Sequence, residues 1–306
     1  MLDAILKTGK PAIARALAML ESAPFSSAAL DLLDEAWASP RAHVIGVTGP
    51  PGVGKSTLLS AVVGELRGRG RTVAVLAVDP SSRRTKGALL GDRTRIDADP
   101  EDQGVFVRSL AARERLGGLA DDAVAAVVLM RALYDVVLVE TVGVGQSETD
   151  VADLADTVVL AVQPASGDSL QFLKAGIAEI PDLAVVTKAD LGPPAERAAR
   201  DLKQALRAQP SHGADSPPPD ILLVAAFEGR GVPDLCDRLG SRLTRIAPGL
   251  PARRAAQARL WLEAWVRAEW GRQGLARARP ELERQDPAAS PFRRLQTVVA
   301  GLAGGD

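Results

Sequence analysis

One nine-residue stretch restricts the fold of this chain more than any other part of it. Residues Gly49 to Thr57 read Gly-Pro-Pro-Gly-Val-Gly-Lys-Ser-Thr and match the pattern G-x-x-x-x-G-K-[ST]. The apolar run from His43 to Thr48 precedes the motif, and a run typical of a helix follows it at once. This position between a predicted strand and a predicted helix indicates a phosphate-binding loop rather than a glycine-rich turn that only joins two elements.

The residue types in this loop suit the chemistry of a bound triphosphate. Glycine backbones let N–H groups close around a β-phosphate, and the helix that follows adds its positive end. We expect Lys55 to contact the β- and γ-phosphates and the Ser56 hydroxyl to bind Mg²⁺. The predicted nucleotide-binding residues of the loop are Gly49, Pro50, Pro51, Gly52, Val53, Gly54, Lys55, Ser56 and Thr57.

Short apolar runs alternate with helical stretches from His43 onward. The runs are VIGVT, TVAVLAV, DVVLVE, TVVLAV, LAVVT and ILLVA. Because they are continuously apolar, helices are expected to cover both faces of the sheet that they form. We therefore predict the α/β fold of a P-loop nucleoside triphosphatase, with three α/β/α layers and a mostly parallel sheet.

Helical extensions are expected at both ends of this domain. Apolar residues recur at helical spacing before residue 40, and after Pro251 the strand signals stop and Ala, Arg, Glu and Trp predominate. The predicted division is an N-terminal helical extension (1–40), a nucleotide-binding P-loop domain (41–248) and a C-terminal helical arm (249–306). Trp261 and Trp265, one turn apart in the arm, are explained by core packing or by contact with another chain, and the sequence leaves both open.

Acidic residues stand at the ends of two predicted strands. Asp79 follows TVAVLAV, and Glu140 ends DVVLVE, three residues before Gly143, which is expected to approach the γ-phosphate. Ligands bind at the carboxyl ends of strands in open α/β sheets, and carboxylate and hydroxyl oxygens are the ligands that Mg²⁺ prefers. We expect Asp79 and Glu140 to join Ser56 around Mg²⁺. Helix capping or a solvated turn is the alternative role for each carboxylate.

A second motif indicates which base is bound. Thr187-Lys188-Ala189-Asp190 matches [NT]-K-x-D, in which a carboxylate accepts hydrogen bonds from two donors that guanine has and adenine lacks. The aliphatic stem of Lys188 is expected to lie against the purine. Backbone N–H groups of Ala225, Ala226 and Phe227 are expected to close over the guanine O6. The expected ligands are GTP or GDP with Mg²⁺.

Composition bears on partners and compartment. Lys and Arg number 37 against 38 Asp and Glu, so no nucleic acid or anionic membrane is expected as a partner. Cys236 is the single cysteine, and no Cys/His spacing resembles a zinc site. The start of the chain lacks the pattern of a signal peptide, and no apolar run reaches the roughly 20 residues that span a bilayer. We expect a cytoplasmic protein.

Several long segments together resemble the MeaB/ArgK family of P-loop GTPases, which belongs to the SIMIBI class. The segments are Gly49–Thr57, Ala77–Ser82, Gly87–Ile96 and Val139–Asp156, and the Thr187–Asp190 motif agrees with them. The resemblance extends from the ALAMLES segment near the N-terminus to about Ile246. This chain has Thr187 where the family usually has Asn, and Ala225-Ala226-Phe227 where the family has a Ser-rich loop. The arm after Pro251 matches poorly.

The resemblance implies a GTPase that acts as a chaperone for an adenosylcobalamin-dependent acyl-CoA mutase of the methylmalonyl-CoA mutase kind. Such a protein gates delivery of the cofactor and protects the mutase. By the same resemblance Asp79, Asp92 and Glu140 surround Mg²⁺ with Ser56, so that Lys55, Glu140 and Asp92 are the expected catalytic residues. The segment 163–174 would act as a switch that senses the mutase, and the arm would form a homodimer.

The sequence leaves other points open. Gln146 positions the attacking water or is a solvated loop residue, and Arg93 and Arg95 stabilise developing charge or form surface ion pairs. His43 and His212 are not placed for catalysis, and the Pro-rich stretch 209–220 is assigned no role. Hydrolysis is expected to be slow and stimulated by a partner. The alternative function is a kinase that phosphorylates an amino-acid transport binding protein (for Lys, Arg or Orn), but no candidate base for it is found.

Overall fold

The computed structural model describes residues 1–80, 96–97, 99–112, 121–141, 151–164, 181–207, 219–283 and 290–304. Within these ranges a seven-stranded sheet runs in the order β3-β2-β4-β1-β5-β6-β7, and every neighbouring pair is parallel. The strands are β1 (His43–Thr48), β2 (Val73–Pro80), β3 (Val105–Ala112), β4 (Val136–Thr141), β5 (Thr157–Val162), β6 (Leu183–Val186) and β7 (Asp220–Leu223). The predicted parallel α/β sheet is confirmed.

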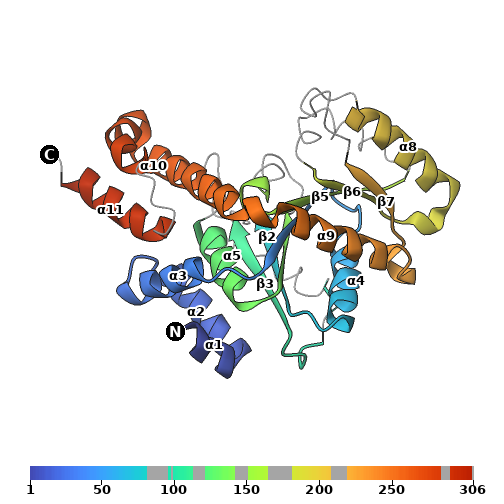
Figure 1. Cartoon of the computed structure of the whole chain (residues 1–306), viewed down its shortest axis with the longest axis horizontal. Helices are drawn as coiled ribbons and strands as arrows, with labels where there is room; N and C mark the ends of the chain where they lie inside the picture. Colours follow the sequence, from blue (N-terminus) through green and yellow to red (C-terminus); the bar gives the residue numbers. More distant parts are fainter. Residues whose placement is uncertain are drawn as a thin grey trace.

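The helices precede, separate and follow these strands (Figure 1). The α-helices are α1 (Leu2–Thr8), α2 (Lys10–Ser22), α3 (Ser27–Ala38), α4 (Lys55–Gly68), α5 (Asp121–Leu133), α8 (Pro193–Arg207), α9 (Val232–Ile246), α10 (Leu250–Glu283) and α11 (Pro291–Ala303). Short 3₁₀ helices are η2 (Val151–Asp153), η4 (Ala189–Leu191), η5 (Ala226–Glu228) and η6 (Ala247–Gly249). Gly271 interrupts α10 with a non-helical backbone (φ 65°, ψ −162°).

Alternate residues of the strands face two different helical layers. Ile45 and Val47 of β1 join α4 and α9 in one core cluster, whereas Val44 belongs to a second cluster with α5 on the opposite face. This period of two is the geometry of an extended strand, and burial on both faces explains why the runs are continuously apolar. The three α/β/α layers are therefore confirmed.

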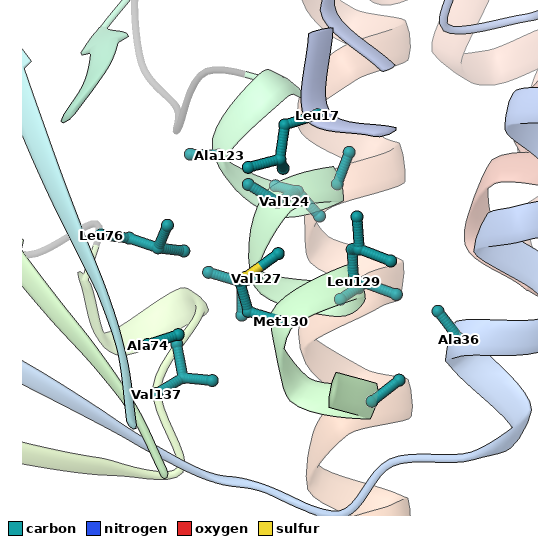
Figure 2. Packing of buried hydrophobic residues seen from close by; sticks show 14 of the residues in the cluster. Leu17, Ala36, Ala74, Leu76, Ala123, Val124, Val127, Leu129, Met130 and Val137 are labelled. Atoms are coloured by element: carbon teal, nitrogen blue, oxygen red, sulfur yellow. The ribbon is translucent and has the colours of Figure 1, made fainter. Parts of the chain in front are cut away.

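The N-terminal helices extend the layer that α5 begins. In Figure 2, Ala74, Leu76 and Val137 of the sheet face Val127 and Met130 of α5, and Leu17 and Ala36 approach α5 from the N-terminal helices. Ser26 starts α3 by accepting a hydrogen bond from the Ala29 N–H, as an N-cap residue does. The N-terminal segment thus shares one hydrophobic core with the sheet.

The C-terminal helices turn back onto the same end of the molecule (Figure 1). Arg293 of α11 pairs with Asp31 and Asp34 of α3, at 2.7 and 2.6 Å. The Trp265 ring meets Phe25 edge-on at 6.3 Å between centroids, and Trp261 lies 5.2 Å from Phe292. Both tryptophans therefore make packing contacts within their own chain.

One strand, β3, was not among the predicted runs. It pairs with β2 from Val73↔Val105 to Pro80↔Ala112, which carries β2 past the expected end at Val78 to include Asp79. β3 is an edge strand, and it carries Arg108 and Ser109 in place of a continuous apolar run. An edge strand has a neighbour on one side only, so its sequence is less strictly apolar than that of a central strand.

Among the described residues, no single helix is long and apolar enough to cross a bilayer. Only α2 and α3 taken together reach that length and apolarity, and the two helices are bent by 118°.

Candidate functional site

The phosphate loop connects the carboxyl end of β1 to the first residue of α4. Gly49 follows Thr48 with φ 148°, and a Cβ atom placed there would lie 2.2 Å from the Ala161 carbonyl oxygen of β5. Only glycine permits this approach of the loop to the neighbouring strand. α4 starts at Lys55, so the unpaired N–H groups and positive end of its first turn face the loop. The strand, loop and helix predicted from the motif are therefore present in order.

Lys55 lies across this loop. Its side chain is buried, and its ammonium donates hydrogen bonds to the carbonyl oxygens of Gly49 at 2.7 Å and Pro50 at 3.2 Å. The positive charge is thus held within the turn where the loop would enclose phosphate groups. Contact of Lys55 with the β- and γ-phosphates stays a prediction.

Ser56 and Glu140 come together from two different elements. The Ser56 hydroxyl, on the first turn of α4, donates a 2.9 Å hydrogen bond to Glu140 Oε1 at the end of β4. Glu140 is 7% exposed, although its side chain carries a charge at neutral pH. A hydroxyl oxygen and a carboxylate oxygen are both hard metal ligands, so this pair fits the ligand preference of Mg²⁺.

The remaining predicted Mg²⁺ ligands cannot be placed around this pair. Asp79 lies in β2, but its side chain is not described, and Asp92 lies outside the described residues. Within the part of the chain that the structure describes, no group of three His, Cys, Asp or Glu side chains is arranged to hold a metal ion. The four-residue metal site remains a prediction.

The motif predicted to read guanine, Thr187–Asp190, follows β6 and is hydrogen-bonded to the phosphate loop. The Thr187 hydroxyl lies 2.7 Å from the Val53 carbonyl and 3.0 Å from the Val162 carbonyl, with one proton to donate between them. Lys188 has a left-handed backbone (φ 52°, ψ 41°), and its ammonium donates to the Gly52 carbonyl at 3.2 Å. The lysine stem therefore runs from β6 to the phosphate loop, along the path expected for one wall of a purine site. Asp190 is exposed in η4, where its carboxylate is accessible to a ligand.

The loop predicted to close over guanine O6 lies beside this motif. The Ala189 N–H donates to the Val224 carbonyl at 3.2 Å, which places Thr187–Asp190 level with Ala225 and Ala226. Ala226 packs against the core cluster that contains α4, so the loop also contacts the helix that carries the phosphate loop. The structure thus brings the predicted phosphate and base residues to the same edge of the sheet.

Gln163 contacts Lys188 of the predicted base site, although the sequence did not assign Gln163 to that site. Its Oε1 accepts a 2.5 Å hydrogen bond from the Lys188 ammonium, directly after β5. The resemblance placed it at the start of a partner-sensing segment, of which residues 165–174 lie outside the described residues. No local pattern marks a glutamine as the neighbour of a lysine 25 residues away, because β5 and β6 become adjacent only in the sheet.

Other predicted residues fall outside the described part or away from the site. Gly143, Gln146, Arg93, Arg95 and His212 are not described. His43 begins β1, at the opposite end of that strand from Gly49, and its Nε2 is 2.8 Å from the Thr157 hydroxyl. Burial lowers its pKa to about 4, mainly by desolvation. His43 therefore lies away from the loop along β1, and that it takes no part in catalysis stays a prediction.

A parallel sheet with a lysine-bearing loop between its first strand and the next helix, and a TKAD motif at the same edge, defines a P-loop nucleotide-binding protein. Residues 13–276 match the family model described as methylmalonyl Co-A mutase-associated GTPase MeaB. The chain belongs to this MeaB family and is a GTPase. The predicted family and enzyme class are confirmed.

Individual relatives agree with this assignment. The chain is 42% identical over 266 residues to a protein of Caulobacter vibrioides that is named as a GTPase, covering 84% of this chain and 81% of that protein. It is 53% identical over 150 residues to a GTPase-named protein of Pyrococcus horikoshii, but spans only 47% of that protein's length. The mitochondrial methylmalonic aciduria type A homolog of Mus musculus is 38% identical over 228 residues, which are 73% of this chain and 55% of the mouse protein.

A solved structure with a similar fold carries a different functional name. The crystal structure of the LAO/AO transport system kinase matches 95% of this chain and 92% of its own, with a TM-score of 0.64 and 26% identity. The similarity extends to most of both chains. The fold is therefore shared between proteins named as GTPases and one named as a kinase.

Proposed function

We propose that this GTPase is a chaperone for an adenosylcobalamin-dependent acyl-CoA mutase of the methylmalonyl-CoA mutase type. It gates delivery of the cofactor to the mutase and protects the mutase from inactivation. The observation that carries this proposal is the match of residues 13–276 to a family described as associated with methylmalonyl-CoA mutase. The similarity to the mouse methylmalonic aciduria type A homolog supports it.

The nucleotide chemistry follows from the residues at the carboxyl edge of the sheet. Lys55 supplies positive charge to the β- and γ-phosphates, and the backbone of Gly49–Gly54 encloses them. Ser56, Glu140, Asp79 and Asp92 hold Mg²⁺, which when bound neutralises charge on the phosphates. Asp190 reads the guanine edge, Lys188 lies on one face of the base, and Gly143 approaches the γ-phosphate.

The proposal also includes the organisation of the whole protein. Residues 1–40, 41–248 and 249–306 serve as extension, GTPase domain and arm, and the arm forms a homodimer. Hydrolysis is slow until the mutase stimulates it. The single cysteine, Cys236, is buried and unpaired, which suits a reducing cytoplasm.

Phosphate release from GTP tests the proposal. Purified protein is incubated with GTP and Mg²⁺, with and without an adenosylcobalamin-dependent mutase, and Lys55→Ala serves as the inactive control. We expect release to rise when the mutase is added. Unchanged release with mutases from the organism that supplies the chain would contradict the chaperone role.

The second candidate is a kinase for an amino-acid transport binding protein, because the LAO/AO transport system kinase has a similar structure. The two candidates differ in where the γ-phosphate goes. With γ-labelled GTP, the chaperone releases label as free phosphate, whereas a kinase leaves it on the binding protein. Label retained on a transport binding protein would favour the kinase.

A further inference from the structure

Phe227 is the most exposed large apolar side chain in the described part of the chain. It is 95% exposed, compared with 55% for Leu260 and 53% for Met1. An aromatic ring in water loses the free energy that burial would provide. The exposure of Phe227 needs an explanation because hydrogen bonds hold the backbone of its turn in place.

The loop that carries Phe227 is a closed turn. Ala225 and Arg230 form an antiparallel bridge in which the Ala225 N–H donates to the Arg230 carbonyl at 3.0 Å. Within it the Glu228 and Gly229 N–H groups donate to the carbonyls of Ala225 and Ala226, at 3.1 and 3.2 Å. Gly231 closes the turn with φ 78°, where a Cβ would lie 2.3 Å from the Leu223 carbonyl. Phe227 therefore projects from a turn held by backbone hydrogen bonds.

Two contacts place this turn at the base end of the nucleotide site. Ala226 packs against the cluster that contains α4, whose first residue is Lys55 of the phosphate loop. On the other side, Val224 accepts the hydrogen bond from Ala189 of the TKAD motif. Leu191, directly after Asp190, is also 52% exposed. An exposed apolar side chain thus follows each of the two segments that are expected to bind the base.

We propose that the Phe227 side chain stacks on the purine ring of the bound nucleotide, opposite the stem of Lys188. The proposal rests on the guanine-binding function above and adds the second face of the base to it. Lys188, after β6, is directed to the Gly52 carbonyl and to Gln163, whereas Phe227 follows β7, the neighbouring strand at the edge of the sheet.

The chemistry of the base favours this occupant. Asp190 contacts the polar edge of guanine, but an edge contact leaves both faces of the ring exposed to water. Every purine has a π face that an aromatic ring can cover, and a residue held on a preformed turn loses little conformational freedom on binding. Phe227 would therefore raise affinity for purine nucleotides in general, and Asp190 would select guanine among them.

The test compares nucleotide affinities of purified variants by calorimetry. Because aromatic stacking is sequence-tolerant, Phe227→Ala should weaken GDP and IDP equally, by about tenfold, and leave inorganic triphosphate unaffected. Phe227→Trp should retain wild-type affinity. Leu260→Ala, which removes another exposed apolar side chain on α10, should change none of these constants.

The outcomes separate this proposal from the function on which it rests. If the wild-type protein binds no guanine nucleotide, the proposed function fails. If it binds GDP and Phe227→Ala binds GDP equally well, only the stacking proposal is overturned, and the ring is then a contact for a partner protein. Loss of inorganic triphosphate binding in Phe227→Ala would also overturn it, because the effect would then be a disturbed loop.

Discussion

Lys55 is the residue on which nucleotide binding is expected to depend most. It is buried at the start of α4, and its charge is directed at the carbonyl oxygens of the loop that it follows. The backbone N–H groups of the loop and of the first turn of α4 are the donors expected to hold the phosphates, together with the ammonium of Lys55.

Lys55→Ala should abolish tight binding of GTP and GDP. Charge-assisted hydrogen bonds to phosphate are worth about 1.5–3 kcal/mol each, so the affinity should fall by about a hundredfold or more. Calorimetric titration with GDP measures this change. Lys203→Ala, on the exposed face of α8, is the matched control and should bind as the wild type does. Retained affinity in Lys55→Ala would refute the assignment of the phosphate loop.

Asp190→Asn should shift base preference from guanine towards xanthine. An amide presents a donor where the carboxylate presents acceptors, and xanthine offers a carbonyl at the position of the exocyclic amine of guanine. Competition between GDP and XDP measures the ratio of the two affinities. Asp201→Asn on α8 changes the same charge away from the site and should leave the ratio unaltered. An unchanged ratio in Asp190→Asn would remove the base-reading role.

At the scale of elements, the base of α10 is attached to the start of β5. Asp156 is fully buried there, and it accepts hydrogen bonds from the Arg254 Nε at 2.9 Å, from Arg254 Nη2 and from the Val44 N–H at 2.9 Å. Arg254 also donates to the Ala42 carbonyl at 2.8 Å, and Gln257 donates to the carbonyls of Ala152 and Ala155. These hydrogen bonds from Arg254 and Gln257 hold the start of α10 against η2 and against the residues that directly precede β1 and β5.

Arg254→Met should destabilise the protein strongly, because it leaves the Asp156 carboxylate buried without its ion pair. Removing one partner of a buried pair costs about 3–5 kcal/mol of unfolding free energy. Urea denaturation measures it. Arg259→Met, which breaks an exposed pair with Glu263 on the same helix, should cost less than about 0.5 kcal/mol.

A second substitution checks the cause of that loss. Asp156→Asn in the Arg254→Met background removes the unpaired charge and should recover part of the stability. Equal destabilisation by the Arg254 and Arg259 variants would show that the buried pair does not hold α10 in place.

At the scale of the whole molecule, His43 connects acidity to the stability of the fold. It is buried at the start of β1 beside Asp156, Arg254 and Arg242, and its pKa is lowered to about 4, first by burial and then by the two arginines, against the opposing effect of Asp156. The unfolded chain, with a histidine pKa near 6.5, therefore binds more protons than the folded protein between these values. Stability is retained above pH 6.5 and lost as the pH falls towards 4.

His43→Gln should reduce this dependence on pH. Between pH 7.5 and pH 5 the histidine contributes a loss of about 2 kcal/mol of unfolding free energy, which the variant should not show. Denaturation curves at the two pH values give the difference for each protein. The same loss in both proteins would assign the effect to other groups.

Much of the fold could be predicted because it is encoded locally. Continuous apolar runs indicated six strands of a covered sheet, and the Gly49–Thr57 pattern indicated the loop and the helix after it. β3 was missed because an edge strand needs less apolar surface. The base site was predicted from Thr187–Asp190, but its neighbour Gln163 was not, since that contact depends on the order of β5 and β6 in the sheet.

The sequence alone determined the class of this protein, because phosphate and guanine chemistry require particular residues at short, fixed spacings. Only the tertiary structure decided that Ser56 meets Glu140 84 residues away, that Arg254 pairs with Asp156, and that Phe227 projects from a closed turn beside the Thr187–Asp190 motif. These relations depend on which strands and helices become neighbours. Tertiary packing decides which elements become neighbours, and a short sequence pattern does not contain that information.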